Sequence, residues 1–417
     1  MTIEEALKFI HSVSWLGSRP GLERLRELLA RLGNPEKRCR FVHIAGTNGK
    51  GSTAAMLAAV LTASGYTTGL YTSPYLWRFN ERIQVDGVQI PDETLCEITE
   101  YVAPHALAMA DSPTEFELVC AIAFEYFARQ RCDFVVLEVG LGGRLDATNV
   151  IEAPDCAVLT NIGLDHTREL GNTVEKIAAE KAGIIKPGCT VIAYEQKPSV
   201  MEVFRTAAQT AGAVYTHADF SRLRPESDSR EGQRFSYRDF AHLELPLLGR
   251  HQLKNAAVVL DTVAALRARG VVIPDAAVRE GLKNTVWPAR FEIVSRRPWF
   301  VVDGGHNPQC AETVADNLNR YFPGMRHVLM LGVLADKDVA GLTDILNASA
   351  DCYVTATPAS PRALPAEQLA EHLEKYGKPV TACGSIPEAV AAAKRLAGDD
   401  GVACCVGSLY MAGEARE

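Results

Sequence analysis

The feature that most constrains this chain is a glycine-rich turn, which follows a short apolar run and leads into an alanine-rich segment. The run and the turn read Phe41-Val42-His43-Ile44-Ala45-Gly46-Thr47-Asn48-Gly49-Lys50-Gly51-Ser52-Thr53. This order predicts a strand, a phosphate-binding loop and a helix from Ala54 to Ser64. Glycines let backbone N–H groups curl around an anion, and a helix N-terminus adds partial positive charge. We therefore expect the turn to bind phosphate, with Lys50 reaching the outer phosphates.

The spacing of this turn departs from the common phosphate-loop pattern. Ile44 stands where that pattern has its first glycine, and Gly51 stands where a metal-binding hydroxyl follows the lysine. Ser52 and Thr53 supply hydroxyls one and two positions later. The alternative is a glycine-rich turn that binds no ligand, and the position of Lys50 at a helix start argues against it.

Length, charge and cysteine spacing limit the class of protein. With 417 residues, 47% of them hydrophobic, the chain is long enough for two domains. The net charge of -8 argues against a nucleic-acid-binding protein, which needs a basic face. Residues 1–10 lack the pattern of a signal peptide, and no apolar run is long enough to span a membrane. None of the eleven cysteines forms a C-x-x-C motif. We expect a cytoplasmic protein with reduced, mostly buried cysteines.

Four polar residues in the first half of the chain follow runs with strand character. They are Ser73, Glu138, Asp165 and His166. In doubly wound parallel sheets, ligands bind beyond the carboxyl ends of the strands, so these side chains are expected beside the phosphate loop. Hard oxygen ligands with a histidine suit Mg²⁺ carried by a nucleotide. The alternative is that Glu138 caps a turn and His166 is a hydrogen-bonded loop residue. Four such positions together favour the metal site.

The rest of the chain alternates between predicted helices and strands. Helical patterns cover 3–32, with a break at 17–21, and then 92–108, 115–129, 173–183 and 249–269. Residues 219–233 are polar without a period, so we expect an exposed loop there. Lys181 lies in one of these helices and would be placed on the surface by its sequence context alone.

From Trp299 to Val406 a second series of strands and helices begins. Such a series closes as a parallel sheet with helices on both faces. The predicted fold is α/β, with a large P-loop parallel-sheet ATPase domain over residues 1–294. A smaller Rossmann-like α/β domain covers residues 295–417.

Read together, nine stretches resemble the folylpolyglutamate synthase and dihydrofolate synthase family, which belongs to the Mur-type ATP-dependent amide ligases. They begin at Gly46, Thr72, Glu138, Asn161, Glu180, Gly249, Trp287, Asp303 and Gly407. The similarity spans nearly the whole chain in order. It is most specific in the combination of the loop at 46–52 with the stretch Leu141-Gly142-Gly143-Arg144-Leu145-Asp146-Ala147-Thr148-Asn149. The unusual loop spacing matches this family's own variant.

The resemblance implies a set of metal and nucleotide contacts. Mg²⁺ is expected on Ser73, Glu138 and His166, the positions that the strand ends had indicated. Lys181 matches a lysine that CO₂ carbamylates, which would add a carboxylate near the metal. The expected ATP contacts are Gly46, Thr47, Asn48, Gly49, Lys50, Gly51 and Ser52 in the loop, Asn255 at the base, Arg290 at the phosphates and Asp303 at the ribose.

The resemblance also implies the substrates. The expected pocket for the pterin side of folate consists of Thr114, Glu115, Phe116 and Glu117 with Leu145, Asp146 and Ala147. His306 is expected to help to place phosphate or the incoming glutamate in a cleft between the domains. Two departures from the family pattern, Ala289 for glycine and Gly305 for alanine, are expected to be harmless. Tyr75, where histidine is frequent, leaves the pterin preference open.

The reaction that follows is an amide ligation in which L-glutamate joins the carboxylate of a folate or folylpolyglutamate. ATP first converts that carboxylate into an acyl phosphate, and Lys50, Lys181 and His306 are the expected catalytic residues. Whether dihydropteroate is a second acceptor is left open by the resemblance. The partners are then small molecules, without nucleic acid or membrane, and the expected state is a monomer. Another Mur-type amino-acid ligase, a P-loop phosphotransferase and a non-catalytic nucleotide switch are the alternatives.

Overall fold

The structure is a computed structural model that describes residues 1–12 and 21–416. Most of the predicted helix break at 17–21 lies outside these residues. The chain divides into two compact units. The first unit comprises Met1–Arg224, Ser236–Glu244 and Leu253–Thr285, and the second comprises Pro225–Phe235, Leu245–Gln252 and Val286–Glu417. The predicted boundary at 294/295 falls within a strand, β12 (Glu292–Arg296), and as a functional division it stays a prediction.

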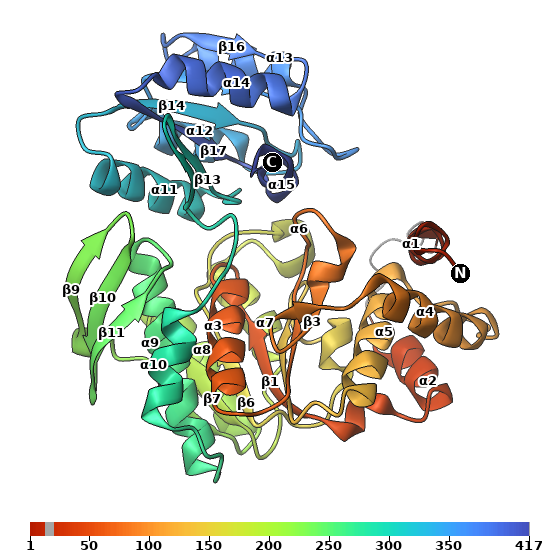
Figure 1. The fold of residues 1–417 in the computed structure, drawn as a ribbon. Helices are drawn as coiled ribbons and strands as arrows, with labels where there is room; N and C mark the ends of the chain where they lie inside the picture. Colours follow the sequence, from red (N-terminus) through yellow and green to blue (C-terminus); the bar gives the residue numbers. More distant parts are fainter. Residues whose placement is uncertain (13–20, 417) are drawn as a thin grey trace. The chain divides into compact units, whose positions relative to one another are not determined.

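The first unit is built on an eight-stranded sheet with the order β4-β3-β2-β5-β1-β6-β7-β8. Strands β1, β3, β6 and β7 of this sheet are labelled in Figure 1. Its strands are β1 (Arg40–Ala45), β2 (Thr68–Tyr71), β3 (Ile83–Val85), β4 (Val88–Gln89), β5 (Phe134–Glu138), β6 (Cys156–Leu159), β7 (Thr190–Ala193) and β8 (Val214–His217). All neighbours are parallel except the pairs β2–β3 and β3–β4, which are antiparallel. The carboxyl ends of β2, β5, β1 and β6 therefore meet at one edge, as the sequence predicted.

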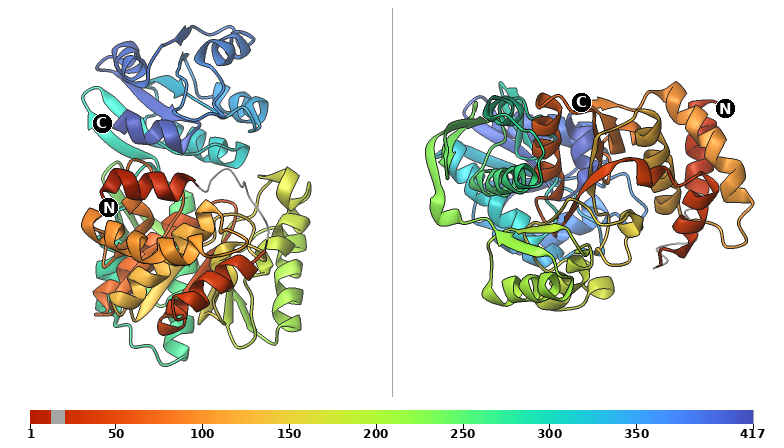
Figure 2. Two further views of the ribbon diagram at one scale, coloured as in Figure 1. Left: turned by 90° about the vertical axis from the view of Figure 1, so that its right-hand side faces the viewer. Right: turned by 90° about the horizontal axis from the view of Figure 1, so that it is seen from below.

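Helices link these strands. They are α1 (Ile3–Ser12), α2 (Glu23–Arg31), α3 (Lys50–Ala63), α4 (Asp92–Leu107), α5 (Glu115–Arg129), α6 (Thr167–Leu170), α7 (Val174–Ala182), α8 (Pro198–Thr210), α9 (Arg250–Ala268) and α10 (Asp275–Lys283). Single 3-10 turns are η2 (Pro35–Arg38), η3 (Phe79–Arg82), η4 (Ala147–Val150) and η5 (Phe220–Arg222). Two further views show α1 and α2 beside α4 and α5, with which they are in contact (Figure 2). No helix in the described ranges has the length and apolar character needed to cross a bilayer.

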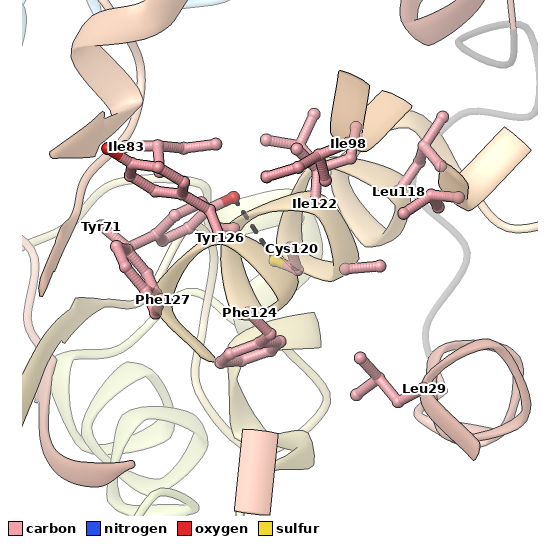
Figure 3. Packing of buried hydrophobic residues seen from close by; sticks show 14 of the residues in the cluster. Leu29, Tyr71, Ile83, Ile98, Leu118, Cys120, Ile122, Phe124, Tyr126 and Phe127 are labelled. Carbon is pink, nitrogen blue, oxygen red and sulfur yellow. Dashed lines mark hydrogen bonds between the residues drawn. The ribbon is translucent and has the colours of Figure 1, made fainter. Parts of the chain in front are cut away.

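A large apolar core in the first unit joins α5 to the sheet (Figure 3). Phe124 on α5 packs edge-on against Phe41 of β1, with ring centroids 5.9 Å apart. The hydroxyl of Tyr71 on β2 accepts a hydrogen bond from the Cys120 thiol at 3.3 Å. Helix α5 is buried over most of its length. Its first turn lies beside the ends of β2 and β5, because Phe116 packs on Tyr71 and Gly140.

The prediction of an exposed loop at residues 219–233 is wrong. Most of it forms β9 (Leu223–Ser229) and the start of β10 (Gly232–Tyr237), which pair with β11 (Phe240–Leu245) in a three-stranded sheet of order β11-β10-β9. Nearly every side chain of β9 is exposed, so this strand carries no alternation of apolar and polar residues. Without an apolar face, an edge strand of this kind has no periodic signal in the sequence.

The second unit contains a six-stranded sheet with the order β12-β13-β17-β14-β15-β16. Its further elements are β13 (Trp299–Val302), α11 (Pro308–Tyr321), β14 (Arg326–Leu331), α12 (Val339–Asn347), β15 (Cys352–Thr355), α13 (Ala366–Glu374), β16 (Val380–Ala382), α14 (Ile386–Ala397), β17 (Gly401–Val406) and α15 (Leu409–Arg416). The predicted parallel sheet is confirmed for β13 to β17, but β12 is antiparallel to β13 and had not been predicted.

Candidate functional site

The glycine-rich turn lies between β1 and α3, as predicted. Gly49 caps α3 with φ of 87°, a left-handed conformation that glycine adopts without strain. The turn is fastened to the segment after β6, because the Thr47 N–H donates to the Asn161 carbonyl at 2.8 Å and the Thr47 hydroxyl contacts Gly163. A Cβ on Gly49 would stand 2.7 Å from Oδ1 of Asn255. The predicted base contact and the predicted phosphate loop are therefore neighbours.

Lys50, Glu138 and Ser73 come together at the end of the sheet. The Lys50 ammonium donates to the Thr47 carbonyl at 3.3 Å and lies 4.0 Å from Oε1 of Glu138. Oε2 of Glu138 accepts a hydrogen bond from the Ser73 N–H at 3.3 Å. Glu138 is only 5% exposed, so its carboxylate is a desolvated oxygen donor next to the phosphate loop. Ser52 and Thr53 are buried in the first turns of α3.

His166 caps the short helix α6 with φ of 50°. Its backbone N–H donates to Oδ1 of Asp165 at 2.9 Å, and its ring nitrogen Nε2 lies 3.9 Å from the same oxygen. The ring is about two-fifths exposed, so it is accessible to a ligand. Within the described residues, no three His, Cys, Asp or Glu side chains are grouped as a protein-only metal site would require. Mg²⁺ commonly takes few protein ligands and completes its shell with water and phosphate oxygens.

Lys181 is buried, and the placement of this residue on the surface from its sequence context was wrong. It lies near the end of α7 and is 5% exposed. Burial, reinforced by the charge of Lys50, lowers the pKa of Lys181 to about 7, although Asp165 and Asp146 act in the opposite direction. Tertiary packing of an alanine-rich helix end hides the side chain, which no local pattern reveals.

The stretch from Leu141 to Asn149 packs on the same end of α7. A Cβ on Gly143 would stand 2.8 Å from the Glu180 carbonyl oxygen, and the Arg144 N–H donates to that oxygen at 2.9 Å. Asp146 is buried, which raises its pKa, whereas hydrogen bonds from the Leu141 N–H and from Thr148 act in the opposite direction. Ala147 is buried, and Leu145 is exposed. Because the two carboxylate oxygens of Asp146 accept hydrogen bonds from Leu141 and Thr148, this residue holds its own loop in shape.

Thr114 and Glu117 form the N-terminal capping box of α5, in which each residue's side chain accepts the other's backbone N–H. Glu117 also forms a bidentate ion pair with Arg24 of α2, at 3.0 Å from Nε and 2.9 Å from Nη2. Its carboxylate is buried and fully engaged in holding the helix. Glu115 is more exposed and lies 3.2 Å from the His11 ring.

Phe116 lies in the first turn of α5, between the capping residues Thr114 and Glu117, and its ring is close to Gly140 at the start of the loop at 140–149. Its ring lies edge-on to Tyr71 at 6.1 Å, and a Cβ on Gly140 would collide with it. Arg82 was not predicted as a functional residue. It is 7% exposed, and its guanidinium lies 5.6 Å from the Phe116 ring centroid and 5.7 Å from that of Phe79. Its Nε has no hydrogen-bond partner within the described residues.

In the second unit, Asp303 follows β13 and Arg290 precedes β12. Asp303 is buried, which raises its pKa, while Arg290 and hydrogen bonds from the N–H groups of Gly305 and Phe291 act against that shift. A Cβ on Gly304 would stand 2.8 Å from Nη1 of Arg290, which places the arginine beside this turn. Nδ1 of His306 lies 3.0 Å from the Gly304 carbonyl. The structure thus brings these three predicted residues together.

Comparison with known proteins identifies both halves of the chain. Residues 44–263 match the model of the Mur ligase middle domain, and residues 289–409 match that of the Mur ligase glutamate ligase domain. The dihydrofolate synthase/folylpolyglutamate synthase of Bacillus subtilis is 38% identical over 90% of this chain and 90% of its own length. The folylpolyglutamate synthase of Lacticaseibacillus casei is 38% identical over 100% of this chain and 98% of its own.

A solved structure supports the same relationship. The folylpolyglutamate synthase of Mycobacterium tuberculosis complexed with ADP and AMPPCP is 34% identical and has a TM-score of 0.92, covering 99% of this chain and 98% of that one. Family models, sequence relatives and fold agree over both units. The chain belongs to the folylpolyglutamate synthase/dihydrofolate synthase family of Mur ligases.

Proposed function

We propose that this chain is an ATP-dependent ligase that joins L-glutamate to the carboxylate of a folate or folylpolyglutamate through an amide bond. The observation that carries the proposal is the meeting of Lys50, Glu138 and Ser73 beside the phosphate loop, in a chain with both Mur ligase domains. ATP is the energy source, and the loop at 46–52 with Asn255, Arg290 and Asp303 supplies its contacts.

The donor set fits Mg²⁺. Glu138 and Ser73 are adjacent hard-oxygen donors, and a buried carboxylate beside a lysine is a suitable place for a cation that arrives with a nucleotide. His166 would complete the set from the exposed turn before α6. The ion would supply neutralisation of negative charge on the phosphoryl oxygens.

Lys181 fits a carbamate. The reaction of a lysine amine with CO₂ gives a carbamate and one proton, and it needs the neutral amine as nucleophile. A pKa of about 7 leaves a large neutral fraction at physiological pH, whereas an ordinary lysine is almost entirely protonated. The product is an anion, which would pair with the nearby charge of Lys50.

The chemistry proceeds in two displacements. The folate carboxylate attacks the γ-phosphorus of ATP, which forms the acyl phosphate and releases ADP. The glutamate amine then attacks the acyl carbon, and phosphate leaves from the tetrahedral intermediate as the amine loses its proton. Lys50 and Arg290 neutralise charge on phosphoryl oxygens, and His306 helps to place phosphate or glutamate. No covalent bond to the protein is needed.

The folate contacts divide into two kinds. Phe116 and Leu145 leave part of their side chains accessible and would touch the pterin, with Ala147 behind them. Thr114, Glu117 and Asp146 would act mainly by holding α5 and the loop in place, and Glu115 lies at the rim. Dihydropteroate as a second acceptor, a monomeric state and a cytoplasmic location stay predictions.

The test is ATP-dependent phosphate release with glutamate and Mg²⁺, comparing dihydropteroate with tetrahydrofolate, and mass spectrometry of the products. Turnover with tetrahydrofolate gives an enzyme that extends the glutamate tail, and turnover with both gives a bifunctional enzyme. Phosphate release that requires neither folate nor glutamate would contradict the proposal. A phosphate ester as product would indicate a phosphotransferase, and nucleotide binding without turnover would indicate a switch.

A further inference from the structure

A buried chain of hydrogen bonds connects the central strand β1 to the loop at residues 140–149. His43 on β1 is 0% exposed, and its ring nitrogen Nε2 lies 2.8 Å from Oγ1 of Thr148 in η4. Thr148 is also fully buried, and its hydroxyl donates to Oδ1 of Asp146. His43 stands on a central strand of the sheet, because β1 is paired on both sides, with β5 and β6.

The direction of each hydrogen bond follows from the groups involved. The Thr148 hydroxyl has a single proton, and it donates that proton to Oδ1 of Asp146. Oγ1 of Thr148 must then accept from His43, which requires a proton on Nε2. Burial, with a smaller effect of Lys186, lowers the pKa of His43 to about 3, so the ring stays neutral. Its Nδ1 has no hydrogen-bond partner within the described residues. His43 is therefore a fixed donor and does not transfer protons.

The end of this chain is Asp146, which shapes the loop. Its second oxygen accepts the Leu141 N–H at 2.8 Å, and its first also accepts the Thr148 N–H at 3.0 Å. The loop backbone rests on the last turn of α7, where a Cβ on Gly143 would stand 2.9 Å from the Lys181 carbonyl oxygen. A shift of Asp146 would thus move the support of Lys181 and the wall of the folate pocket together.

We propose that His43 is a positioning residue for the ligase reaction: through Thr148 it fixes Asp146, and with it the loop at 140–148, against the turn of α7 that carries Lys181. The part of this inference that concerns catalysis rests on the proposed function. The part that concerns the loop rests only on the contacts above, so the two can fail separately.

The test compares His43→Leu, which removes the donor, with His43→Gln, which keeps an amide donor at the same reach. Amide hydrogen exchange is measured at Leu141 and Thr148, whose N–H groups donate to Asp146. We expect His43→Leu to speed both exchanges and to lower kcat/KM for the folate acceptor about ten-fold, the loss typical of one buried hydrogen bond. The KM for ATP should stay within about two-fold, and His43→Gln should recover most of the loss.

A double-mutant cycle separates positioning from general destabilisation. Because His43 acts through Thr148, adding His43→Leu to Thr148→Val should cost little more than Thr148→Val alone. The matched control is Phe41→Leu, which lies two residues away on the same strand, packs against Phe124 and loses buried size. Equal effects of Phe41→Leu on the two amides, or additive effects in the double variant, would overturn the proposal.

Should His43→Leu not fold, Thr148→Val and Thr148→Ser test the same link, and only the valine variant is expected to speed exchange at Leu141. If the wild-type chain shows no ligase turnover, the proposed function fails, while the exchange rates still decide whether His43 holds the loop. Unchanged exchange in every variant would overturn the role of His43 even in an active ligase.

Discussion

Gly49 and Asn255 lie against each other, and a Cβ on Gly49 would stand 2.7 Å from Oδ1 and 3.2 Å from Nδ2 of the asparagine. The first residue caps α3, and the second lies in the first turns of α9. The phosphate loop follows β1 directly, and its Thr47 is hydrogen-bonded to Asn161 in the segment after β6. At Gly49 the loop lies against the side-chain amide of Asn255. This contact links the predicted phosphate and base sites.

Gly49→Ala is expected to raise the KM for ATP more than ten-fold. An alanine at φ of 87° costs about 1–2 kcal/mol, and its methyl group would also displace Asn255. The matched control is Gly65→Ala, since Gly65 has φ of 88° and open space around its Cβ position. Both variants carry the backbone strain, and only Gly49→Ala should lose nucleotide affinity in calorimetric titration with ADP. Equal affinity in the two would contradict a role for the contact.

Lys181→Ala is expected to reduce turnover strongly, and Lys181→Glu, which restores a carboxylate, to recover part of it. If the carbamate forms, wild-type activity should fall as CO₂ is removed and as pH falls through about 7, where the amine becomes protonated. Lys176→Ala, on the same helix but not among the buried residues, serves as the control. Initial rates with and without bicarbonate measure the effect, and equal rates in wild type and Lys181→Ala would exclude the carbamate.

The same lysine should also affect stability. Its pKa is lower in the folded chain than in the unfolded one, so the folded state binds fewer protons between about pH 7 and pH 10.5. Stability from this group therefore rises with pH across that window, and the cost of burying its charge is fully present below pH 7. In CO₂-free buffer, Lys181→Met should raise the Tm at pH 6.5 and have a smaller effect at pH 10, as followed by thermal unfolding. A Tm gain that does not depend on pH would contradict this assignment.

Glu117→Ala is expected to lower the free energy of unfolding by on the order of 3 kcal/mol, because it leaves the guanidinium of Arg24 buried without its bidentate partner. Thr114→Ala, which removes only the cap, should cost about 1 kcal/mol. Urea denaturation measures both. Glu115→Gln is the control, because the carboxylate of Glu115 lies beside the exposed ring of His11. A Glu117→Gln variant with unchanged stability and a raised KM for folate would instead mark Glu117 as a direct substrate contact.

The meeting of Ser73 and Glu138 at one edge could be predicted because strand order fixes it. The carboxyl ends of parallel strands lie at the same edge of a sheet, so the polar residues that end or follow these strands are placed there together. The hydrogen bond between Glu138 and the Ser73 N–H reflects that constraint. The capping box of Thr114 and Glu117 also has a local sequence signature, although both residues had been predicted only as part of the folate pocket. Features determined by one element and its order along the chain were accessible in this way.

Features that depend on distant packing were not. The loop at 140–148 packs on the end of α7, where Lys181 is buried. The edge strand β9 has no apolar face that would reveal it in the sequence. Ala289, which was expected to replace glycine harmlessly, has φ of 53° and is completely buried. A left-handed alanine stores about 1 kcal/mol of strain, so this exchange is not free of consequence.

Asp155 is hydrogen-bonded to two arginines, Arg40 and Arg269, and should make the stability of the fold depend on pH in the acid range. Burial alone would raise its pKa, but hydrogen bonds from Arg40 at 2.8 and 3.0 Å and from Arg269 at 3.0 Å outweigh burial and hold the pKa below its ordinary value. A carboxylate whose pKa is depressed on folding stabilises the fold above its unfolded pKa of about 3.9, and this contribution disappears as pH falls through the folded value.

Asp155→Asn should therefore lower the free energy of unfolding at pH 7, and its difference from wild type should shrink steadily below pH 4. The bridge ties the start of β1 to the end of α9, so the loss should appear in the cooperative transition of the first unit. Asp399→Asn, an exposed residue after α14, is the control and should follow wild type at every pH. Urea unfolding at a series of pH values measures the difference. If the gap between Asp155→Asn and wild type stayed constant down to pH 3, the ion pair would not be the source of the stabilisation.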